Sequence, residues 1–247
     1  MQGLILAAGR GSRLGELTSS NPKGLTPVLG VSMLERQLMA MQSAYILEIA
    51  AASGYMSEKI KDYIPKLFHN ADWQTSNMVS SLLGCHEYLQ TDTTIVSYSD
   101  IIYPTQVISN LIKADGDIVV AYDPHWQQQW QLRFDNPLDD AESFALDNVG
   151  LLMDIGQKVK DIDSVQGQFM GLFKLTVNGF KLINDITANL DLSIVNKLDM
   201  TALLKMLLSH NVIINVMPIN DFWFEIDSQK DLAVCEDYMS KNNIILS

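Results

Sequence analysis

The sequence predicts an α/β fold in which a mixed, mainly parallel sheet is covered by helices on both faces. Short apolar runs of strand length alternate with helix-length amphipathic segments through most of the 247 residues. No internal repeat and no linker rich in Pro, Gly or Ser divides the chain. We therefore expect one domain that spans residues 1–247.

Each element is predicted from its apolar pattern, in chain order. Strands are expected at Gly3–Ala8, Ile46–Ala52, Thr94–Tyr98, Asp117–Tyr122, Gly167–Leu175, Asn211–Val216 and Trp223–Ile226. Helices are expected near Ser32–Ser43, Ser57–Tyr63, Met78–Leu89, Thr105–Lys113, Asn178–Ala188, Met200–Ser209 and Ser228–Ser240. Ser228 is a suitable N-cap for the last helix, and Asp231 can partly complete a capping box.

The alternation of strands and helices is interrupted after the fourth strand. Residues 124–148 are rich in Trp, Gln and Asp and show no clear period. We interpret residues 124–175 as a small excursion from the sheet within the same domain.

Composition limits the classes of partner. The chain has 17 basic and 29 acidic residues and a net charge of -12, which argues against nucleic acid and anionic membranes as partners. The two cysteines are too few for a disulfide framework, and no apolar stretch is long enough to span a membrane. A cytoplasmic protein is expected, and a homodimer is one assembly it could form.

The first thirty residues combine a glycine-rich loop with local positive charge. A buried strand leads into Gly9 and Gly11, and three basic residues, Arg10, Arg13 and Lys23, accompany a single acid. Glycines let consecutive backbone N–H groups turn toward an anion, and fixed cations complete a phosphate site. The alternative is a tight turn with solvated arginines.

Two familiar phosphate loops fit this segment poorly. A dinucleotide-binding loop requires a third glycine at position 14, where the chain has Leu14 and then Gly15. An ATPase loop requires Gly-Lys-Ser/Thr, whereas the chain has Lys23 before Gly24.

The run LILAAGRGSRLGELTSSNPKGLTPV closely resembles the signature LAAGxGxRLxxxTxxxPK of nucleotidyltransferases that make NDP-activated compounds. Within that superfamily the chain is similar to the bacterial CTP:phosphocholine cytidylyltransferases and their phosphonate-handling relatives. Further segments that carry the resemblance are WQTSNMVSSLL, IVSYSDIIY, QGQFMGLF, LDMTALL and FEIDSQKDL. The resemblance implies a Rossmann-like nucleotidyltransferase fold.

The resemblance also implies roles for the loop. Arg13 would hold the β- and γ-phosphates of CTP, and Lys23 would bridge the α-phosphate and the attacking phosphate. The backbone of Leu6, Ala7, Ala8, Gly9, Arg10 and Gly11 would carry the nucleotide. Asn77 and Ser81 would read the base and ribose; amide and hydroxyl groups suit a cytosine, although capping of the following helix is an equal alternative.

Two carboxylates are placed to hold magnesium. Asp100 follows the strand Thr94–Tyr98, and Asp227 follows the strand Trp223–Ile226. Strand ends of an α/β sheet are where ligands bind, and Mg²⁺ prefers carboxylate and phosphate oxygens. Each acid alone could be a turn or helix-start residue. Glu225 alternates with buried positions and is a less suitable ligand.

The pocket for the acceptor is expected in the excursion. Trp126, Trp130, Phe134 and Phe169 could wall a site for a cationic head group, although aromatic residues are more often core. Asp199, Asp139 and Asp140 could pair with an ammonium group. Lys158 could reach the acceptor phosphate or phosphonate, or be an ordinary surface residue.

The sequence therefore predicts an enzyme that transfers CMP from CTP to a small phosphorylated or phosphonate compound, with phosphocholine-like acceptors first, and releases pyrophosphate. A sugar-1-phosphate nucleotidyltransferase is the alternative in the same class. A dinucleotide-binding oxidoreductase and a non-catalytic nucleotide sensor are alternatives from other classes.

Overall fold

A seven-stranded sheet forms the centre of the computed structural model, which describes residues 1–246. The strand order is β12-β8-β11-β6-β1-β4-β5. All neighbouring strands are parallel except β11, which runs antiparallel to both β6 and β8. The predicted mixed, mainly parallel sheet is confirmed. The sheet strands are β1 (Gln2–Ala7), β4 (Ile49–Ser53), β5 (Lys66–His69), β6 (Thr94–Tyr98), β8 (Ile118–Asp123), β11 (Gln168–Leu175) and β12 (Asn215–Pro218).

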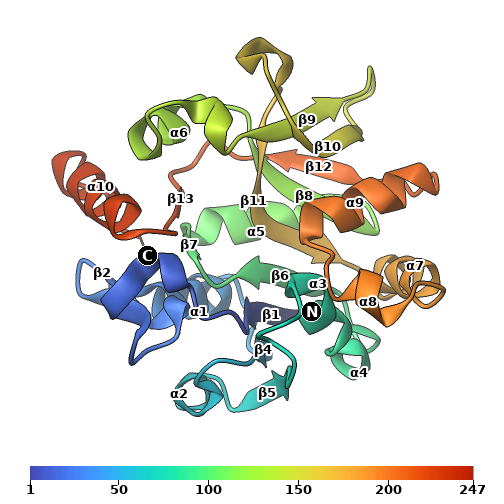
Figure 1. Ribbon diagram of the computed structural model, residues 1–247, viewed down its shortest axis with the longest axis horizontal. Coiled ribbons are helices and arrows are strands. Elements are labelled where there is room, and N and C mark those ends of the chain that lie inside the picture. Colours follow the sequence, from blue (N-terminus) through green and yellow to red (C-terminus); the bar gives the residue numbers. More distant parts are fainter. Residues whose placement is uncertain (247) are drawn as a thin grey trace.

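Helices cover both faces of the sheet, as predicted. In Figure 1, α1 and α5 lie on one side of the sheet and α3, α7 and α9 lie on the other. The helices are α1 (Met33–Ser43), α2 (Ser57–Lys61), α3 (Met78–Leu83), α4 (His86–Leu89), α5 (Thr105–Lys113), α6 (Gln127–Arg133), α7 (Val177–Thr187), α8 (Leu192–Val195), α9 (Met200–Ser209) and α10 (Gln229–Lys241). Among the described residues, no helix is long and apolar enough to cross a membrane.

Buried aliphatic residues of the central strands explain why the sheet forms here. Every residue of β1 and β8 is buried, which is the pattern of strands covered on both faces. Three short two-stranded pairs surround the sheet: β2 (Pro27–Val28) with β3 (Val31–Ser32), β7 (Ile101–Ile102) with β13 (Phe224–Glu225), and β9 (Glu142–Leu146) with β10 (Leu152–Lys158).

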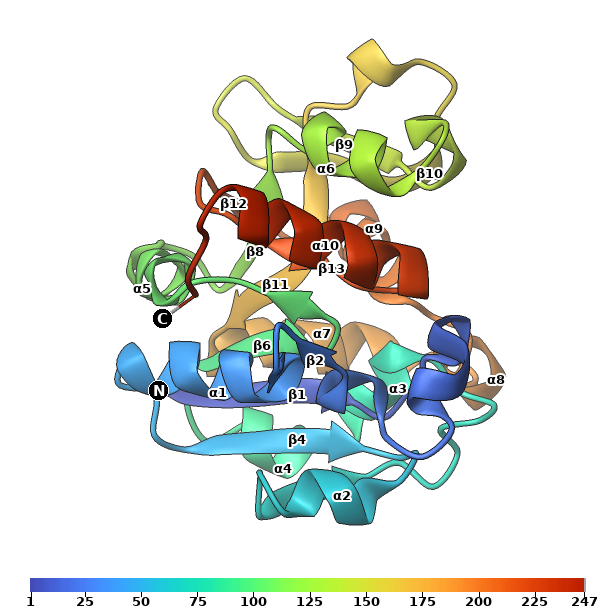
Figure 2. The ribbon, with the colours of Figure 1, turned by 90° about the vertical axis from the view of Figure 1, so that its left-hand side faces the viewer.

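The excursion leaves the sheet after β8 and returns through β11. It contains α6 and the hairpin β9–β10, which lie together at one end of the molecule in both views (Figures 1 and 2). Residues 168–175, the last part of the predicted range 124–175, form β11 in the middle of the sheet. The part outside the sheet is therefore residues 124–167.

Several predicted elements differ from the structure, among them the strand expected at Asn211–Val216, which begins only at Asn215 and ends at Pro218. The strand expected at Trp223–Ile226 is only two residues long and pairs with β7 outside the main sheet. The helix expected over Met78–Leu89 is divided into α3 and α4, with Gly84 as the C-cap of α3. Strand β5 was not predicted, because its four residues are too short to show a period.

Candidate active site

The loop after β1 brings Gly11 against the side chain of Lys23. Gly11 has a φ of 71°, in the left-handed region that glycine adopts without a Cβ clash. A Cβ built on Gly11 would lie 2.7 Å from the Cβ of Lys23. The hydroxyl of Thr18 donates to the Gly11 carbonyl at 3.0 Å and supports the turn. Glycine at this position lets the lysine stem cross the loop.

The Lys23 ammonium lies between two carboxylates that follow strands. Its Nζ donates to Asp100 Oδ2 at 2.7 Å and also to Asp227 Oδ1. Burial alone would lower the pKa of Lys23, but the charges and hydrogen bonds of both acids raise it above its ordinary value. The lysine is therefore a buried cation, and the structure brings together three residues that the sequence singled out.

Asp227 is contacted by three cations. Arg13 Nη2 lies 3.0 Å from Asp227 Oδ1, the oxygen that Lys23 also contacts, while Arg133 Nη2 lies 3.4 Å from Oδ2. Burial acts to raise the pKa of Asp227, but Lys23, Arg13 and Arg133 outweigh it and hold the pKa below its ordinary value. Arg13 itself is two-thirds exposed, with a side-chain exposure of 67%, so its guanidinium stays open to a ligand.

Arg133, the last residue of α6, is buried and connects the excursion to this acidic group. Its Nη1 donates to Glu225 Oε2 at 2.6 Å and its Nε donates to Asp231 Oδ1 at 3.2 Å. The other oxygen of Asp231 accepts from the backbone N–H of Asp227 at 3.1 Å. The guanidinium also lies over the ring of Phe134, 5.0 Å from the centroid. Arg133 therefore fixes the carboxylates relative to α10.

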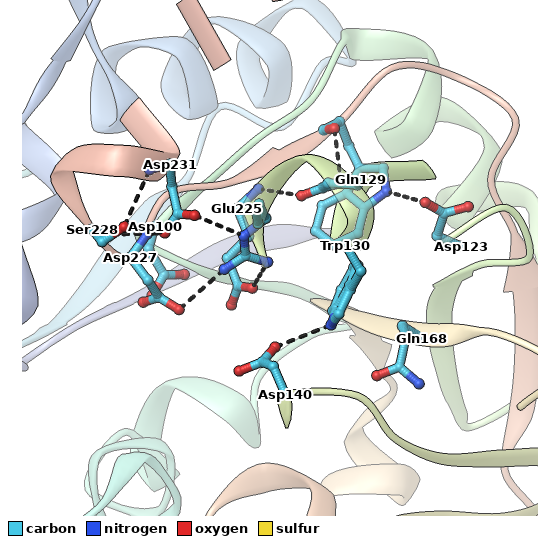
Figure 3. Close-up of polar contacts among 12 residues, drawn as sticks. Asp100, Asp123, Gln129, Trp130, Asp140, Gln168, Glu225, Asp227, Ser228 and Asp231 are labelled. Carbon is cyan, nitrogen blue, oxygen red and sulfur yellow. Dashed lines mark hydrogen bonds and ion pairs between the residues drawn. The ribbon is translucent and has the colours of Figure 1, made fainter. Parts of the chain in front are cut away.

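Three carboxylates could hold a divalent cation. One oxygen each of Asp100, Glu225 and Asp227 lies within 4.8 Å of the others. Asp100 Oδ1 is buried and has no hydrogen-bond partner among the described residues, which leaves a lone pair for a cation. Carboxylate oxygens are the ligands that Mg²⁺ prefers, so this donor set fits that ion. Figure 3 shows Glu225 beside Asp100 and Asp227, which makes it a third candidate ligand, and its role stays a prediction.

A pocket of about 200 Å³ opens beside Lys23 and Asp100 at the carboxyl end of the sheet. It is lined by Leu6, Ala8, Gly9, Gly11, Lys23, Trp73, Ser76, Asn77, Met78, Ser81, Tyr98, Ser99 and Asp100. Most of the residues expected to carry the nucleotide thus share one cavity. Arg10 is exposed next to it, with its guanidinium 5.4 Å from the ring centroid of Tyr55. A larger cavity of about 550 Å³ lies between α6 and residues 219–224, and its lining includes neither Lys23 nor Asp100.

Asn77 and Ser81 both have structural partners and both face the pocket. Asn77 is the N-cap of α3, and its side chain accepts from the backbone N–H of Met78 at 2.8 Å. The Ser81 hydroxyl accepts from Asn70 Nδ2 at 2.9 Å. Capping and lining the pocket are therefore compatible, and base recognition by these two residues stays a prediction.

The two tryptophans of α6 and its N-cap lie in the core instead of on an open wall. Trp126 is 1% exposed and donates to the carbonyl of Val165 at 3.3 Å. Trp130 is 3% exposed and donates to Asp140 at 3.1 Å. The cation that lies over the Trp130 ring is the protein's own Arg133, 5.3 Å from the centroid. Both tryptophans therefore pack in the core, which was the alternative to a role in walling the acceptor pocket.

The other residues expected at the acceptor pocket are spread more widely. Phe169 packs edge-on against Tyr98, with ring centroids 5.9 Å apart, near the end of β6. Asp199 is the N-cap of α9 and accepts from the backbone N–H of Ala202 at 2.8 Å. Lys158 is exposed on the hairpin β9–β10. Phe169 therefore contacts Tyr98, a residue that lines the 200 Å³ pocket, whereas none of Phe169, Asp199 and Lys158 is itself in that lining.

Negative charge gathers around Tyr98, which sequence reasoning had not singled out. Burial, and then the charges of Asp100, Asp199, Glu225 and Glu142, raise the pKa of Tyr98 well above its ordinary value. The four carboxylates come from four separate parts of the chain, so no local pattern could place them together. Arg133 was missed for a similar reason, because a lone arginine at the end of an irregular segment carries no signal.

Comparison with known proteins places the chain in a family. Residues 3–147 match the model of the MobA-like NTP transferase domain. The chain is 31% identical to a CTP:phosphoglutamine cytidylyltransferase of Campylobacter jejuni, over 95% of this chain and 98% of that protein. It is 30% identical to a CMP-5'-(3-aminopropyl)phosphonate synthase of Streptomyces rubellomurinus, over 49% of this chain and 20% of that protein.

Solved structures confirm the expected fold. The inositol-1-phosphate CTP transferase of T. maritima superposes with a TM-score of 0.74 at 17% identity and covers 100% of this chain and 97% of that one. The CTP:phosphocholine cytidylyltransferase of Streptococcus pneumoniae gives a TM-score of 0.71 at 19% identity, over 96% of this chain and 98% of that one. With its glycine loop, its lysine between strand-end acids and these matches, the chain belongs to the family of MobA-like NTP transferase domains.

Proposed function

We propose that this chain is a magnesium-dependent cytidylyltransferase that transfers CMP from CTP to a small phosphorylated or phosphonate compound. The observation that carries the proposal is the position of Lys23 and Arg13. Both cations contact Asp227 beside the 200 Å³ pocket, at the carboxyl end of the sheet. At such a site the cations can bind phosphate groups and the carboxylates can bind a divalent ion.

The reaction requires one bond to form and one to break. An oxygen of the acceptor phosphate attacks the α-phosphorus of CTP, and the bond between the α-phosphorus and the bridging oxygen breaks to release pyrophosphate. Negative charge increases on the phosphate oxygens and the leaving group, so the protein contributes mainly position and positive charge. Lys23 would contact the α-phosphate and the attacking phosphate, and Arg13, open to solvent, would contact the β- and γ-phosphates.

Asp100, Asp227 and Glu225 would hold the magnesium ion. When bound, such an ion neutralises charge on phosphate oxygens. Arg133 would keep Asp227 and Glu225 oriented, since it contacts both carboxylates from the buried side.

The acceptor is proposed to carry a phosphate or phosphonate together with a cationic nitrogen. The carboxylates of Glu142 and Asp199 near Tyr98 support this class of acceptor, because an ammonium group there would meet two acids that form no ion pair within residues 1–246. The relatives from C. jejuni and S. rubellomurinus are named for a phosphoglutamine and an aminopropylphosphonate. Both compounds fit the same class of acceptor.

Pyrophosphate release tests the reaction. The purified protein is incubated with CTP or UTP, with magnesium or with EDTA, and with a panel that includes phosphocholine, 2-aminoethylphosphonate, phosphoglutamine and a sugar 1-phosphate. We expect release that requires CTP, magnesium and an amine-bearing acceptor. Lys23→Ala should abolish release and leave the far-UV circular dichroism spectrum intact. The proposal would be contradicted if pyrophosphate were released without an acceptor. It would also be contradicted if no acceptor in the panel led to release.

Asp199→Asn tests the acceptor side separately. Asparagine is as good an N-cap as aspartate, so α9 should keep its cap while the site loses one charge. We expect the KM for an amine-bearing acceptor to rise about tenfold, the change that one lost charge-assisted contact of roughly 1.4 kcal/mol produces, and the KM for CTP to stay unchanged. Equal changes in both KM values would show that Asp199 does not read the acceptor.

A further inference from the structure

We propose that Lys23 has a second role: in the nucleotide-free protein, its ammonium occupies the position between Asp100 and Asp227 and so suppresses metal binding until a nucleotide is present. This inference rests on the proposed function, in which the same two acids hold the metal. In this role the lysine ammonium competes with the divalent cation for the two carboxylates.

The contacts of Asp227 explain why a cation must leave before a metal can bridge the two acids. Its Oδ1 is contacted by Lys23 and Arg13, and its Oδ2 by Arg133. Asp100 offers one free oxygen, Oδ1, while its Oδ2 accepts from Lys23 at 2.7 Å. Each oxygen of Asp227 thus already contacts a cation, and among residues 1–246 Lys23 is the only cation that contacts both acids.

Of the three cations on Asp227, Lys23 is the one that can be replaced. Arg133 is 2% exposed and has two further carboxylate partners, Glu225 and Asp231, so its removal would leave several buried charges unpaired. Arg13 has a mostly exposed side chain and does not contact Asp100, so its departure would not open the space between the acids. Lys23 sits on a flexible four-carbon stem, and a phosphate can accept its ammonium in place of the carboxylates.

The exchange makes metal and nucleotide binding depend on each other. Without nucleotide, a metal ion can bridge the two acids only if Lys23 gives up both ion pairs. No phosphate is then present to accept the lysine ammonium, so the exchange is costly. With nucleotide, the ammonium can move to a phosphate oxygen. By linkage, if the nucleotide strengthens metal binding by a given free energy, the metal strengthens nucleotide binding by the same free energy.

Metal binding without nucleotide tests this role. Binding of Mn²⁺ alone is measured by electron paramagnetic resonance on wild type, Lys23→Met, Lys23→Arg and Arg13→Gln, with folding checked by thermal melting. We expect Lys23→Met to bind Mn²⁺ about tenfold or more tightly than wild type, because it removes the competing buried cation. Lys23→Arg, which keeps a charge of the same sign, should bind Mn²⁺ as weakly as wild type.

Arg13→Gln is the matched control, because it also removes one positive charge from Asp227. A general electrostatic effect would tighten Mn²⁺ binding in Arg13→Gln as much as in Lys23→Met. We expect a change of about threefold at most in Arg13→Gln, since its charge is largely exposed and screened. The proposal is overturned if Lys23→Met binds Mn²⁺ no more tightly than wild type or than Arg13→Gln. Because this assay contains no CTP and no acceptor, its outcome is independent of whether pyrophosphate is released.

Discussion

Asp227 concentrates the electrostatics of the site in one side chain. Three cations contact it, and its backbone N–H is held by Asp231 at 3.1 Å. The sequence alone indicated Asp227 and two of these cations, because they lie in a recognisable loop and at a strand end. Arg133 could not be predicted, since its partners are about a hundred residues away along the chain.

Gly11 gives a prediction at the residue scale. Gly11→Ala should lose about 1 kcal/mol of stability from the left-handed backbone, and in addition displace Lys23, whose Cβ would lie 2.7 Å from the new methyl group. We expect kcat to fall at least about tenfold, as a misplaced catalytic group predicts. Gly30→Ala is the control, because Gly30 has a φ of 84° but open space around it. It should lose stability and retain activity; equal activity losses in both variants would refute the argument from the clash.

Asp123 gives a pH-dependent prediction. Burial raises the pKa of its carboxyl above the ordinary 3.8, although hydrogen bonds from Trp223 and from the backbone of His125 act in the opposite direction. Above pH 3.8 the folded protein therefore binds more protons at Asp123 than the unfolded chain, so this group lowers stability as the pH rises through its folded pKa. Asp123→Asn should remove that decline.

Urea unfolding at a series of pH values measures the effect of Asp123→Asn. The difference in unfolding free energy, variant minus wild type, should rise with pH from 3.8 upward and then level off. A difference that falls over this window would mean that the Asp123 pKa is lowered in the folded protein.

At the scale of elements, the start of α10 connects a helix cap to the site. Ser228 and Asp231 form a complete capping box, and the same Asp231 holds the backbone of Asp227 and the guanidinium of Arg133. The cap was predicted from the sequence because its signature is local. The partner of the preceding strand was not, because β13 pairs with β7, which lies far away in the chain.

Two capping boxes allow the local and the catalytic effects to be separated. Ser228→Ala and Ser32→Ala each remove the serine of a box, at α10 and α1 respectively. Each should lower stability by about 1 kcal/mol in thermal melting. Only Ser228→Ala should also lower kcat/KM, because Asp231 loses a partner that orients it toward Asp227. If Ser32→Ala reduces kcat/KM equally, the cap of α10 has no special connection to the site.

At the scale of the whole molecule, hydrophobic periodicity was sufficient to predict one sheet with helices on both faces. It could not predict that β11 is inserted antiparallel between β6 and β8, because strand order depends on contacts between distant segments. Nor could it separate the tryptophans of the excursion, which pack in the core, from residues that line a pocket. The homodimer and the cytoplasmic location stay predictions.

A thermal-shift series tests the nucleotide preference of the whole molecule. A ligand that binds only the folded state raises the melting temperature, so the size of the shift ranks ligands. With magnesium, CTP should raise the melting temperature more than UTP at equal concentration. A larger shift with UTP would favour a uridylyl enzyme over a cytidylyl one.

The antiparallel return through β11 has a consequence for how such a chain could diversify. Residues 124–167 leave from β8 and re-enter at β11, which is hydrogen-bonded to β8, so both ends of the segment are anchored to neighbouring strands. A replacement of different length could be grafted for residues 135–167 alone, so that α6 keeps Arg133 and its contacts with Asp227 and Glu225. Evolution, or an engineer, could in this way vary the hairpin end of the molecule while the cations and carboxylates around Asp227 stay in place.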